Sequence, residues 1–152
     1  MTLEELEKRV RALEDIEEIK KLHSDYIYWL DNKQWEEMIG CFGENVTEDI
    51  AGTGGPHKGI GEIGKAFREK IAKEKTAKGG HILAEPVITV EGDKAKGYWT
   101  LYRFDTFTTP AGQLVKYSQG RYDCEYIREH GKWKFSRLKF TKPWPEKPRQ
   151  MT

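Results

Sequence analysis

The stretch DYIYWLDNKQW, residues 25–35, decides the fold, because a long helix pattern ends there among large aromatic side chains. Upstream of it, aliphatic residues recur every three or four positions, which predicts one amphipathic helix over residues 3–30. The last turn is bulky on every side, and a helix that is apolar all round is usually enclosed by protein. Asp31 and Asn32 favour a turn, so we expect the helix to end at this carboxylate.

Beyond residue 35 the pattern predicts short helices first and then a run of strands. The spacing predicts a short helix over 35–42, a strand over 46–51, a glycine-rich loop over 52–59, a helix over 60–73 and a polar connection over 74–80. From His81 the apolar period becomes two, which predicts strands joined by hairpin turns over 81–90, 94–108, 114–128 and 132–141. Helices followed by a meander of strands are typical of α+β folds. We therefore expect helices packed against a strongly curved, mostly antiparallel sheet.

The composition narrows the classes of protein. At 152 residues the chain is expected to form one domain over 1–152, with a helical extension over 1–11 and a proline-rich tail over 143–152. Its 26 basic and 25 acidic residues give no reason to expect binding to nucleic acid or to an anionic membrane. No apolar run is long enough for a membrane span, and the acidic start does not resemble a signal peptide, so we expect a cytoplasmic protein. Cys41 and Cys124 are expected to be free thiols.

His81 is the histidine with the clearest candidate partner. It opens a strand, whereas Asp31 closes the first helix, and we expect the two side chains to meet. Such a carboxylate fixes the tautomer of a neutral imidazole and stabilises the imidazolium after proton uptake. The alternative for Asp31 is a plain helix-ending turn residue. We expect His23 and His130 to be structural or exposed, whereas His57 lies in a glycine-rich loop that could flank a site.

The sequence indicates neither a metal nor a cofactor. No two of the histidines have the spacing of metal ligands on a helix or hairpin. The glycine-rich loop lacks the lysine-serine or lysine-threonine of a phosphate-binding loop, and no G-x-S-x-G motif is present. Any proton abstraction would therefore need a carbon acid that an adjacent carbonyl or conjugation activates.

Three segments, in their order and spacing, resemble the SnoaL-like branch of the nuclear-transport-factor-like superfamily, whose fold is a cone-shaped α+β barrel. They are DIEEIKKLHSDYIYWLDNKQWEEM, PHKGIGEIGKAF and GRYDCEYIREHGKWKFSRL, within roughly residues 12–142. Similar members include scytalone dehydratase, a hexachlorocyclohexane dehydrochlorinase and a bile-acid dehydratase. The resemblance implies a cofactor-free lyase with an Asp–His pair, in which His81 is the base, Asp31 its partner and Tyr26 an auxiliary acid. Tyr26 could equally be a plain core tyrosine.

The resemblance also implies which strand face lines the site. It turns Trp99, Leu101 and Arg103 inward and leaves the opposite aromatic face, which includes Tyr98 and Tyr102, for a subunit partner. Arg103 replaces an aspartate of the bile-acid enzyme, which implies a different substrate, although it could simply pair with Asp105. The full set expected to bind substrate is Trp29, Trp99, Leu101, Arg103, Tyr122 and Lys142.

The sequence therefore predicts a dehydratase-type lyase that acts on a small hydrophobic or polycyclic substrate and forms a homo-oligomer, either a trimer or a dimer. Four alternatives stay open: an isomerase, a polyketide cyclase, an epoxide hydrolase, and a non-catalytic module that binds a small ligand. Fold alone does not choose among them.

Overall fold

The first helix, α1, spans Leu3–Asp31 in a computed structural model that describes residues 1–50, 53–72 and 78–142. Its N-terminus is a capping box: the Thr2 hydroxyl accepts from the Glu5 N–H at 3.1 Å, and the Glu5 carboxylate accepts from the Thr2 N–H at 2.7 Å. At the other end the Asn32 N–H donates to the Tyr28 carbonyl at 3.0 Å. The predicted helix over 3–30 is thereby confirmed, and Asp31 is its last residue.

The region after α1 differs from the prediction in its boundaries. Helix α2, Trp35–Ile39, is shorter than expected, and strand β1, Phe42–Ile50, begins four residues before the predicted start at 46. The cause is tertiary: the Cys41 carbonyl accepts from the Phe135 N–H at 3.0 Å, which draws the chain into the sheet at Phe42. Residue 51, the predicted end of this strand, lies outside the described residues.

The glycine-rich segment is also more ordered than predicted. It contains a short strand, β2 (His57–Lys58), which pairs with β1 through Glu48 and Thr47. Helix α3, Gly59–Ala66, follows and passes into a π-helical turn, η1 (Phe67–Ile71), instead of running as one helix over 60–73. The positive φ of 80° at Gly59 shows why glycine suits this junction. The predicted polar connection lies partly outside the described residues, and its last three residues belong to the next strand.

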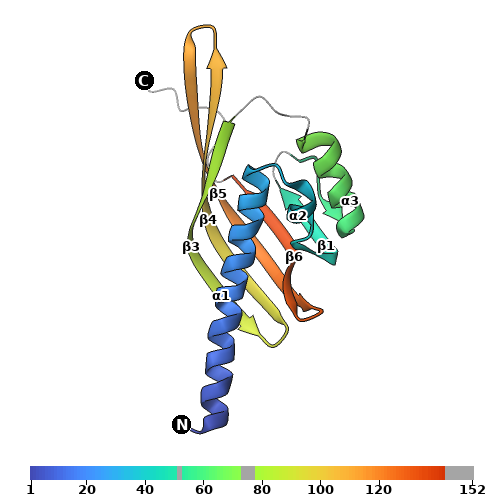
Figure 1. The fold of residues 1–152 in the computed structure, drawn as a ribbon, viewed down its shortest axis with the longest axis vertical. Coiled ribbons are helices and arrows are strands. Elements are labelled where there is room, and N and C mark those ends of the chain that lie inside the picture. The colour runs from blue at the N-terminus through green and yellow to red at the C-terminus, as the bar shows by residue number, and fades with distance from the viewer. Residues whose placement is uncertain (51–52, 73–77, 143–152) are drawn as a thin grey trace.

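The rest of the chain forms four long strands of a six-stranded sheet. They are β3 (Lys78–Glu91), β4 (Lys94–Thr109), β5 (Gly112–Glu129) and β6 (Lys132–Thr141). The strand order is β2-β1-β6-β5-β4-β3, with β1 parallel to β6 and the other pairs antiparallel. The sheet curls without closing, α1 lies along its inner side, and the β4–β5 hairpin extends beyond it (Figure 1). The predicted α+β cone is confirmed.

The two faces of the curled sheet differ in burial. Strand β4 alternates buried and exposed residues over its first half, so that Trp99 and Leu101 point inward, at 5 % and 2 % exposure. The opposite face of β4 is continuous with the outer faces of β3 and β5. Large exposed side chains line this outer surface: Ile82, Val87, Tyr98, Tyr102, Phe104 and Tyr117. The homo-oligomer expected from this aromatic outer face stays a prediction.

The described part of the chain has no helix that is both long and apolar enough to cross a membrane. Within the same residues, no cluster of three or more histidine, cysteine, aspartate or glutamate side chains is arranged to hold a metal ion. Cys41 and Cys124 are free thiols, as predicted, and both are buried.

Candidate active site

The candidate site is built on a contact between the end of α1 and strand β3. Asp31 Oδ1 lies 2.5 Å from His81 Nδ1, and Asp31 Oδ2 accepts a hydrogen bond from the His81 backbone N–H at 3.1 Å. One carboxylate therefore holds both the imidazole ring and the strand that carries it. The two side chains are partly open to solvent, with 13 % of His81 and 24 % of Asp31 exposed. The structure thus brings together the two residues that the sequence singled out.

The short contact has a local cause in the sequence. Asp31 ends its helix because Asn32 caps it, with the Asn32 Nδ2 donating to the Tyr28 carbonyl at 2.8 Å. His81 is fixed along β3 by backbone pairing with Arg103 of β4. A helix end and a strand pairing thus determine the positions of both partners. The free imidazole nitrogen, Nε2, has no hydrogen-bond partner among the residues that the structure describes.

Arg103 lies opposite His81 on the neighbouring strand β4. Its Cα is the cross-strand partner of His81, so both side chains leave the same face. Its Nε lies 3.0 Å from an oxygen of Asp105, so the Arg103–Asp105 ion pair considered as the alternative is also formed. A guanidinium has five N–H donors, and this contact uses only the one on Nε. Arg103 can therefore serve Asp105 and still receive an oxyanion.

Two buried tyrosines of the core, Tyr26 on α1 and Tyr122 on β5, were expected to take part in the site. Tyr26 is fully buried and its hydroxyl has no partner within the described residues. Burial, followed by the charges of Tyr122 and Glu48, raises the pKa of Tyr26 well above its usual range. Burial also raises the pKa of Tyr122; the Asp31 carboxylate raises it further, whereas the Arg103 guanidinium lowers it. Tyr26 is therefore a neutral hydroxyl beside Tyr122, whose pKa its side-chain contact lowers, and Tyr122 lies within electrostatic reach of Asp31 and Arg103.

The other residues expected to bind substrate are placed differently. Trp99 donates its Nε1–H to the Tyr126 hydroxyl at 3.0 Å and packs 4.7 Å from the His23 ring, in the core. Leu101 is buried as well, whereas Trp29 is half-buried and stacks edge-on against Tyr28 at 4.9 Å. Lys142 is exposed just after β6, and no contact ties it to Asp31 or His81 within the described residues.

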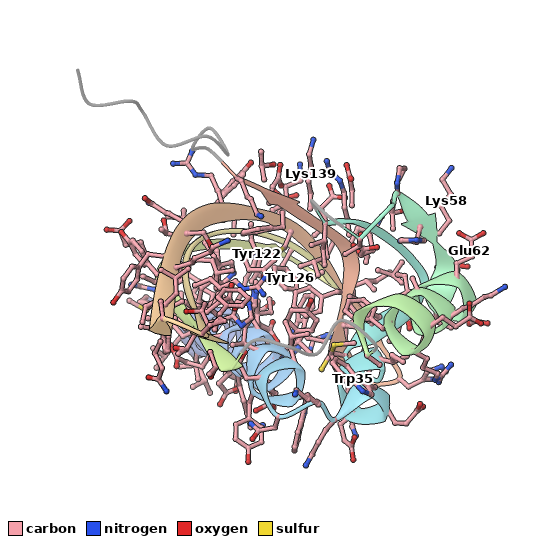
Figure 2. The ribbon with its side chains drawn as sticks, turned by 90° about the horizontal axis from the view of Figure 1, so that it is seen from above. Trp35, Lys58, Glu62, Tyr122, Tyr126 and Lys139 are labelled. Atoms are coloured by element: carbon pink, nitrogen blue, oxygen red, sulfur yellow. The ribbon has the colours of Figure 1, made fainter. Side chains whose placement is uncertain are left out.

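His23 is the histidine of the core. Its ring is fully buried, and Nδ1 lies 3.3 Å from the Tyr126 hydroxyl. Burial lowers the pKa of His23 to about 3, so the ring is neutral at physiological pH. Tyr122 and Tyr126 lie inside the curve of the sheet when the molecule is seen from above (Figure 2). Of the two placements expected from the sequence, structural or exposed, His23 has the first.

The sequence did not single out Glu48 as a functional residue. Glu48 is fully buried on β1, and its Oε2 lies 2.6 Å from His57 Nδ1. A signal was present, because alternation along β1 puts Glu48 on the same face as Val46 and Ile50. A glutamate in an otherwise apolar row needs a partner.

A recess of about 410 Å³ lies away from these residues, near the β3–β4 turn. Its lining comes from β3, β4, β5 and β6 and includes Thr89, Glu91, Lys96, Glu125, Ile127 and Ser136. None of the predicted catalytic residues lines it. The recess is therefore separate from the Asp31–His81 pair.

Helices enclosed by a curled, unclosed mixed sheet, with an aspartate–histidine contact at the end of the first helix, define an α+β cone protein. The chain belongs to the family of SnoaL-like domains, whose model matches residues 11–139. No curated protein matches it.

Solved structures show the same fold at low sequence identity. A provisionally named scytalone dehydratase from Novosphingobium aromaticivorans DSM 12444 is 20 % identical, with a TM-score of 0.75, and the match covers 87 % of this chain and 86 % of the other. The hexachlorocyclohexane dehydrochlorinase LinA-type3 from Novosphingobium barchaimii LL02 is also 20 % identical, with a TM-score of 0.72 and coverage of 87 % and 88 %. A protein of unknown function from Mycobacterium tuberculosis is 21 % identical, with a TM-score of 0.69 and coverage of 87 % and 73 %. The fold therefore occurs both in proteins named as enzymes and in proteins without a known activity.

Proposed function

We propose that the protein is a cofactor-free lyase of the dehydratase type, with His81 as the base. The observation that carries this proposal is the bond between Asp31 Oδ1 and His81 Nδ1 at 2.5 Å, in a pair that solvent can still reach. A carboxylate on Nδ1 favours the tautomer with its proton there, which leaves the lone pair on Nε2. The presence of enzymes named for elimination among the structural neighbours supports the same class of reaction.

The proposed reaction is a β-elimination. His81 Nε2 takes a proton from a carbon next to a carbonyl, the C=C bond forms, the C–O bond to a β-hydroxyl breaks, and the proton on His81 passes to the departing oxygen, which leaves as water. Negative charge develops on the carbonyl oxygen, where the guanidinium of Arg103, the cross-strand partner of His81, would stabilise it. Tyr26, the auxiliary acid that the resemblance implies, is fully buried in the core, so the proposed reaction does not rely on it. The small, hydrophobic substrate expected from the sequence is kept as part of this proposal.

The test is an elimination assay on β-hydroxy ketones with aromatic or polycyclic substituents. The product is a conjugated enone, whose new absorbance band reports turnover. We expect the wild type to convert at least one such ketone and His81→Gln to lose nearly all of this activity with its fold intact. His130→Asn is the matched control, because His130 lies exposed in the β5–β6 turn at a positive φ of 50° that asparagine adopts readily. Equal turnover by wild type and His81→Gln would refute the assignment of the base.

A ligand-binding module is the alternative of a different class, and the half-buried Trp29 near the end of α1 offers a probe for it. Quenching of tryptophan fluorescence by hydrophobic ketones, equal in the wild type and in His81→Gln and without any product, would favour binding over catalysis.

A further inference from the structure

The first three turns of α1 carry an apolar stripe that this chain does not cover. Every residue from 1 to 11 is exposed, and this end of α1 extends beyond the sheet (Figure 1). The sheet reaches α1 at Asp15, which accepts hydrogen bonds from Arg128 at 2.7 Å and from Trp133 at 3.1 Å. The stripe consists of four aliphatic side chains that are 45 to 72 % exposed: Leu3, Leu6, Val10 and Leu13.

The stripe points away from the core of its own chain. The buried residues of α1 form a separate face: Asp15, Ile19, His23, Tyr26 and Ile27. By helical geometry the two faces lie about 150° apart round the helix. The aliphatic spacing is the cause, because every step from Val10 to Leu22 is three residues and falls about 60° short of a full turn. The sheet of the same chain therefore cannot bury the stripe, and covering it takes a second molecule.

The stripe has the heptad spacing of a short coiled coil. Its a positions are Leu3 and Val10, and its d positions are Leu6 and Leu13. The next a and d residues are Glu17 and Lys20, which bond to each other at 2.8 Å, so the apolar seam is two heptads long. A β-branched residue such as Val10 at a, with leucine at d, favours two strands. The helix is already formed within the monomer, so pairing does not have to nucleate it.

The charges beside the stripe favour a parallel pair of identical helices. In a parallel coiled coil each g residue faces the e residue five positions later in the second helix, which here joins Arg9 to Glu14 of the second copy. An antiparallel pair would instead bring Arg9 beside Arg9 and Glu7 beside Glu7, and like charges repel. Arg9 and Glu14 are exposed and form no ion pair within the described residues, so both are available for this contact.

A membrane surface is a poorer occupant of the stripe. Residues 2–14 carry four acidic and three basic side chains, whereas helices that lie on anionic membranes are rich in lysine and arginine. A second copy also meets no obstacle. Because each stripe faces away from its own core, the two cones lie on opposite sides of a parallel helix pair.

We propose that residues 3–14 of α1 form a parallel, two-stranded coiled coil with a second copy of this chain. The surface is distinct from the aromatic outer face of the sheet. Asp31 and His81 lie at the other end of α1, so this dimer leaves both candidate sites open. Because the seam is only two heptads long, the dimer should dissociate on dilution.

Sedimentation equilibrium over a range of concentrations tests the dimer. We expect the wild type to approach twice the mass of one chain, and Leu6→Glu to stay at the mass of one chain, because it places a charge in the seam. Lys8→Glu is the matched control, since Lys8 lies on the side of the helix away from the seam, and it should dimerise as the wild type does. Circular dichroism checks that both variants keep the fold.

Oxidative crosslinking of Leu13→Cys tests the register. In a parallel pair the two residues 13 lie side by side, within the roughly 7 Å between Cα atoms that a disulfide allows, whereas an antiparallel pair separates them by about 15 Å along the axis. The native thiols, Cys41 and Cys124, are buried. We expect at least about tenfold more covalent dimer from Leu13→Cys than from Lys8→Cys on a non-reducing gel.

Charge exchange tests the orientation without changing the stripe. Arg9→Glu should raise the concentration at which half of the chains are dimeric by about fivefold, because it replaces an attraction with a repulsion in both symmetric contacts. Adding Glu14→Arg to the same chain restores opposite charges and should restore the wild-type value.

Three outcomes would overturn the proposal. A wild type that stays at the mass of one chain up to its solubility limit would exclude the second copy. An oligomer that Leu6→Glu does not weaken would place the interface elsewhere, for example on the aromatic outer face of the sheet. Equal crosslinking of Leu13→Cys and Lys8→Cys would exclude the parallel register.

Discussion

Two regions beside α1 surround a histidine ring in different ways. At the open end, defined here as Asp31, His81 and Arg103, the ring has a carboxylate partner and remains partly exposed. Eight residues earlier on the helix, about 12 Å by helical rise, His23 lies in the aromatic core that it forms with Trp99, Tyr126 and Phe135. The same side chain thus has two kinds of surroundings: a carboxylate and solvent at His81, which suit the proposed base, and a dry aromatic enclosure at His23, which suits packing.

Tyr122 connects the two regions. Its ring packs 4.7 Å from the ring of His23, while its hydroxyl lies within electrostatic reach of Asp31 and Arg103. Tyr122 therefore belongs to the aromatic core and also borders the open end. Changes at the open end should alter chemistry, whereas changes in the core should alter stability and its dependence on pH.

The largest effect should follow from removing the base itself. His81→Gln takes away the nitrogen that accepts the proton, and we expect turnover to fall by about 10⁴-fold. The far-UV circular dichroism should stay unchanged, because the His81 side chain packs at the partly exposed open end. Steady-state elimination rates check this, and a loss of less than tenfold would place the base elsewhere.

A smaller loss should follow from Asp31→Asn. The amide can donate to Nδ1, which favours the tautomer with the proton on Nε2 and so occupies the lone pair that the reaction needs. We expect turnover to fall by about 10³-fold, with a smaller change in substrate affinity. Separate values of kcat and KM check it; a rise in KM alone would mean that Asp31 binds substrate rather than orienting His81.

In the core, the expected effect is on stability at acid pH. Burial lowers the pKa of His23 to about 3 from 6.5, so between these values the unfolded chain binds one more proton than the folded chain. The free energy of unfolding should therefore fall as the pH drops below 6.5, by up to about 1.4 kcal/mol per pH unit from this group.

His23→Leu should remove that part of the pH dependence. Urea unfolding of the wild type and the variant at several pH values between about 4 and 7 measures the difference in slope. Parallel curves would show that His23 is protonated in the folded protein or unfolded locally. Either result would contradict the contrast between a neutral, buried His23 and a partly exposed His81.

The smallest effect on activity should come from deleting residues 1–11. This end of α1 carries an exposed apolar stripe, with Leu3 at 72 % and Leu6 at 49 % exposure, and it lies far from both histidines. We expect turnover to stay within about twofold of the full chain, because the deleted turns contribute nothing to the core. If the stripe packs on a second copy, the molar mass by light scattering will fall; an unchanged mass would count against that role.

The overall fold and the Asp31–His81 pair could be predicted from the sequence because local signals agreed with the tertiary structure. The apolar spacing of α1, its capping box at Thr2 and its turn at Asn32 fixed the helix, and the period-two strands after His81 fixed the sheet. The boundaries put Asp31 at a helix end and His81 near the start of a strand, and the resemblance to SnoaL-like proteins is what paired them. The structure then shows the contact that this resemblance led us to expect.

The parts that escaped prediction depend on partners far away in the sequence. Strand β1 starts at Phe42 because the Phe135 backbone N–H donates a hydrogen bond to the Cys41 carbonyl, and no local pattern reveals this contact. The pairing of Glu48 with His57 needs β2, a strand too short to leave a periodic signal. Trp99 was correctly turned inward, but the structure places it beside His23 because Tyr126 binds its indole.

Nitrogen-15 NMR of the imidazole rings, in wild type and in Asp31→Asn at a pH where the rings are neutral, measures which ring nitrogen of His81 carries the proton. We predict that His81 in the wild type carries its proton on Nδ1, with an unprotonated Nε2, and that Asp31→Asn shifts the proton to Nε2. A wild-type His81 with its proton on Nε2 would contradict the claim that Asp31 prepares His81 as the base.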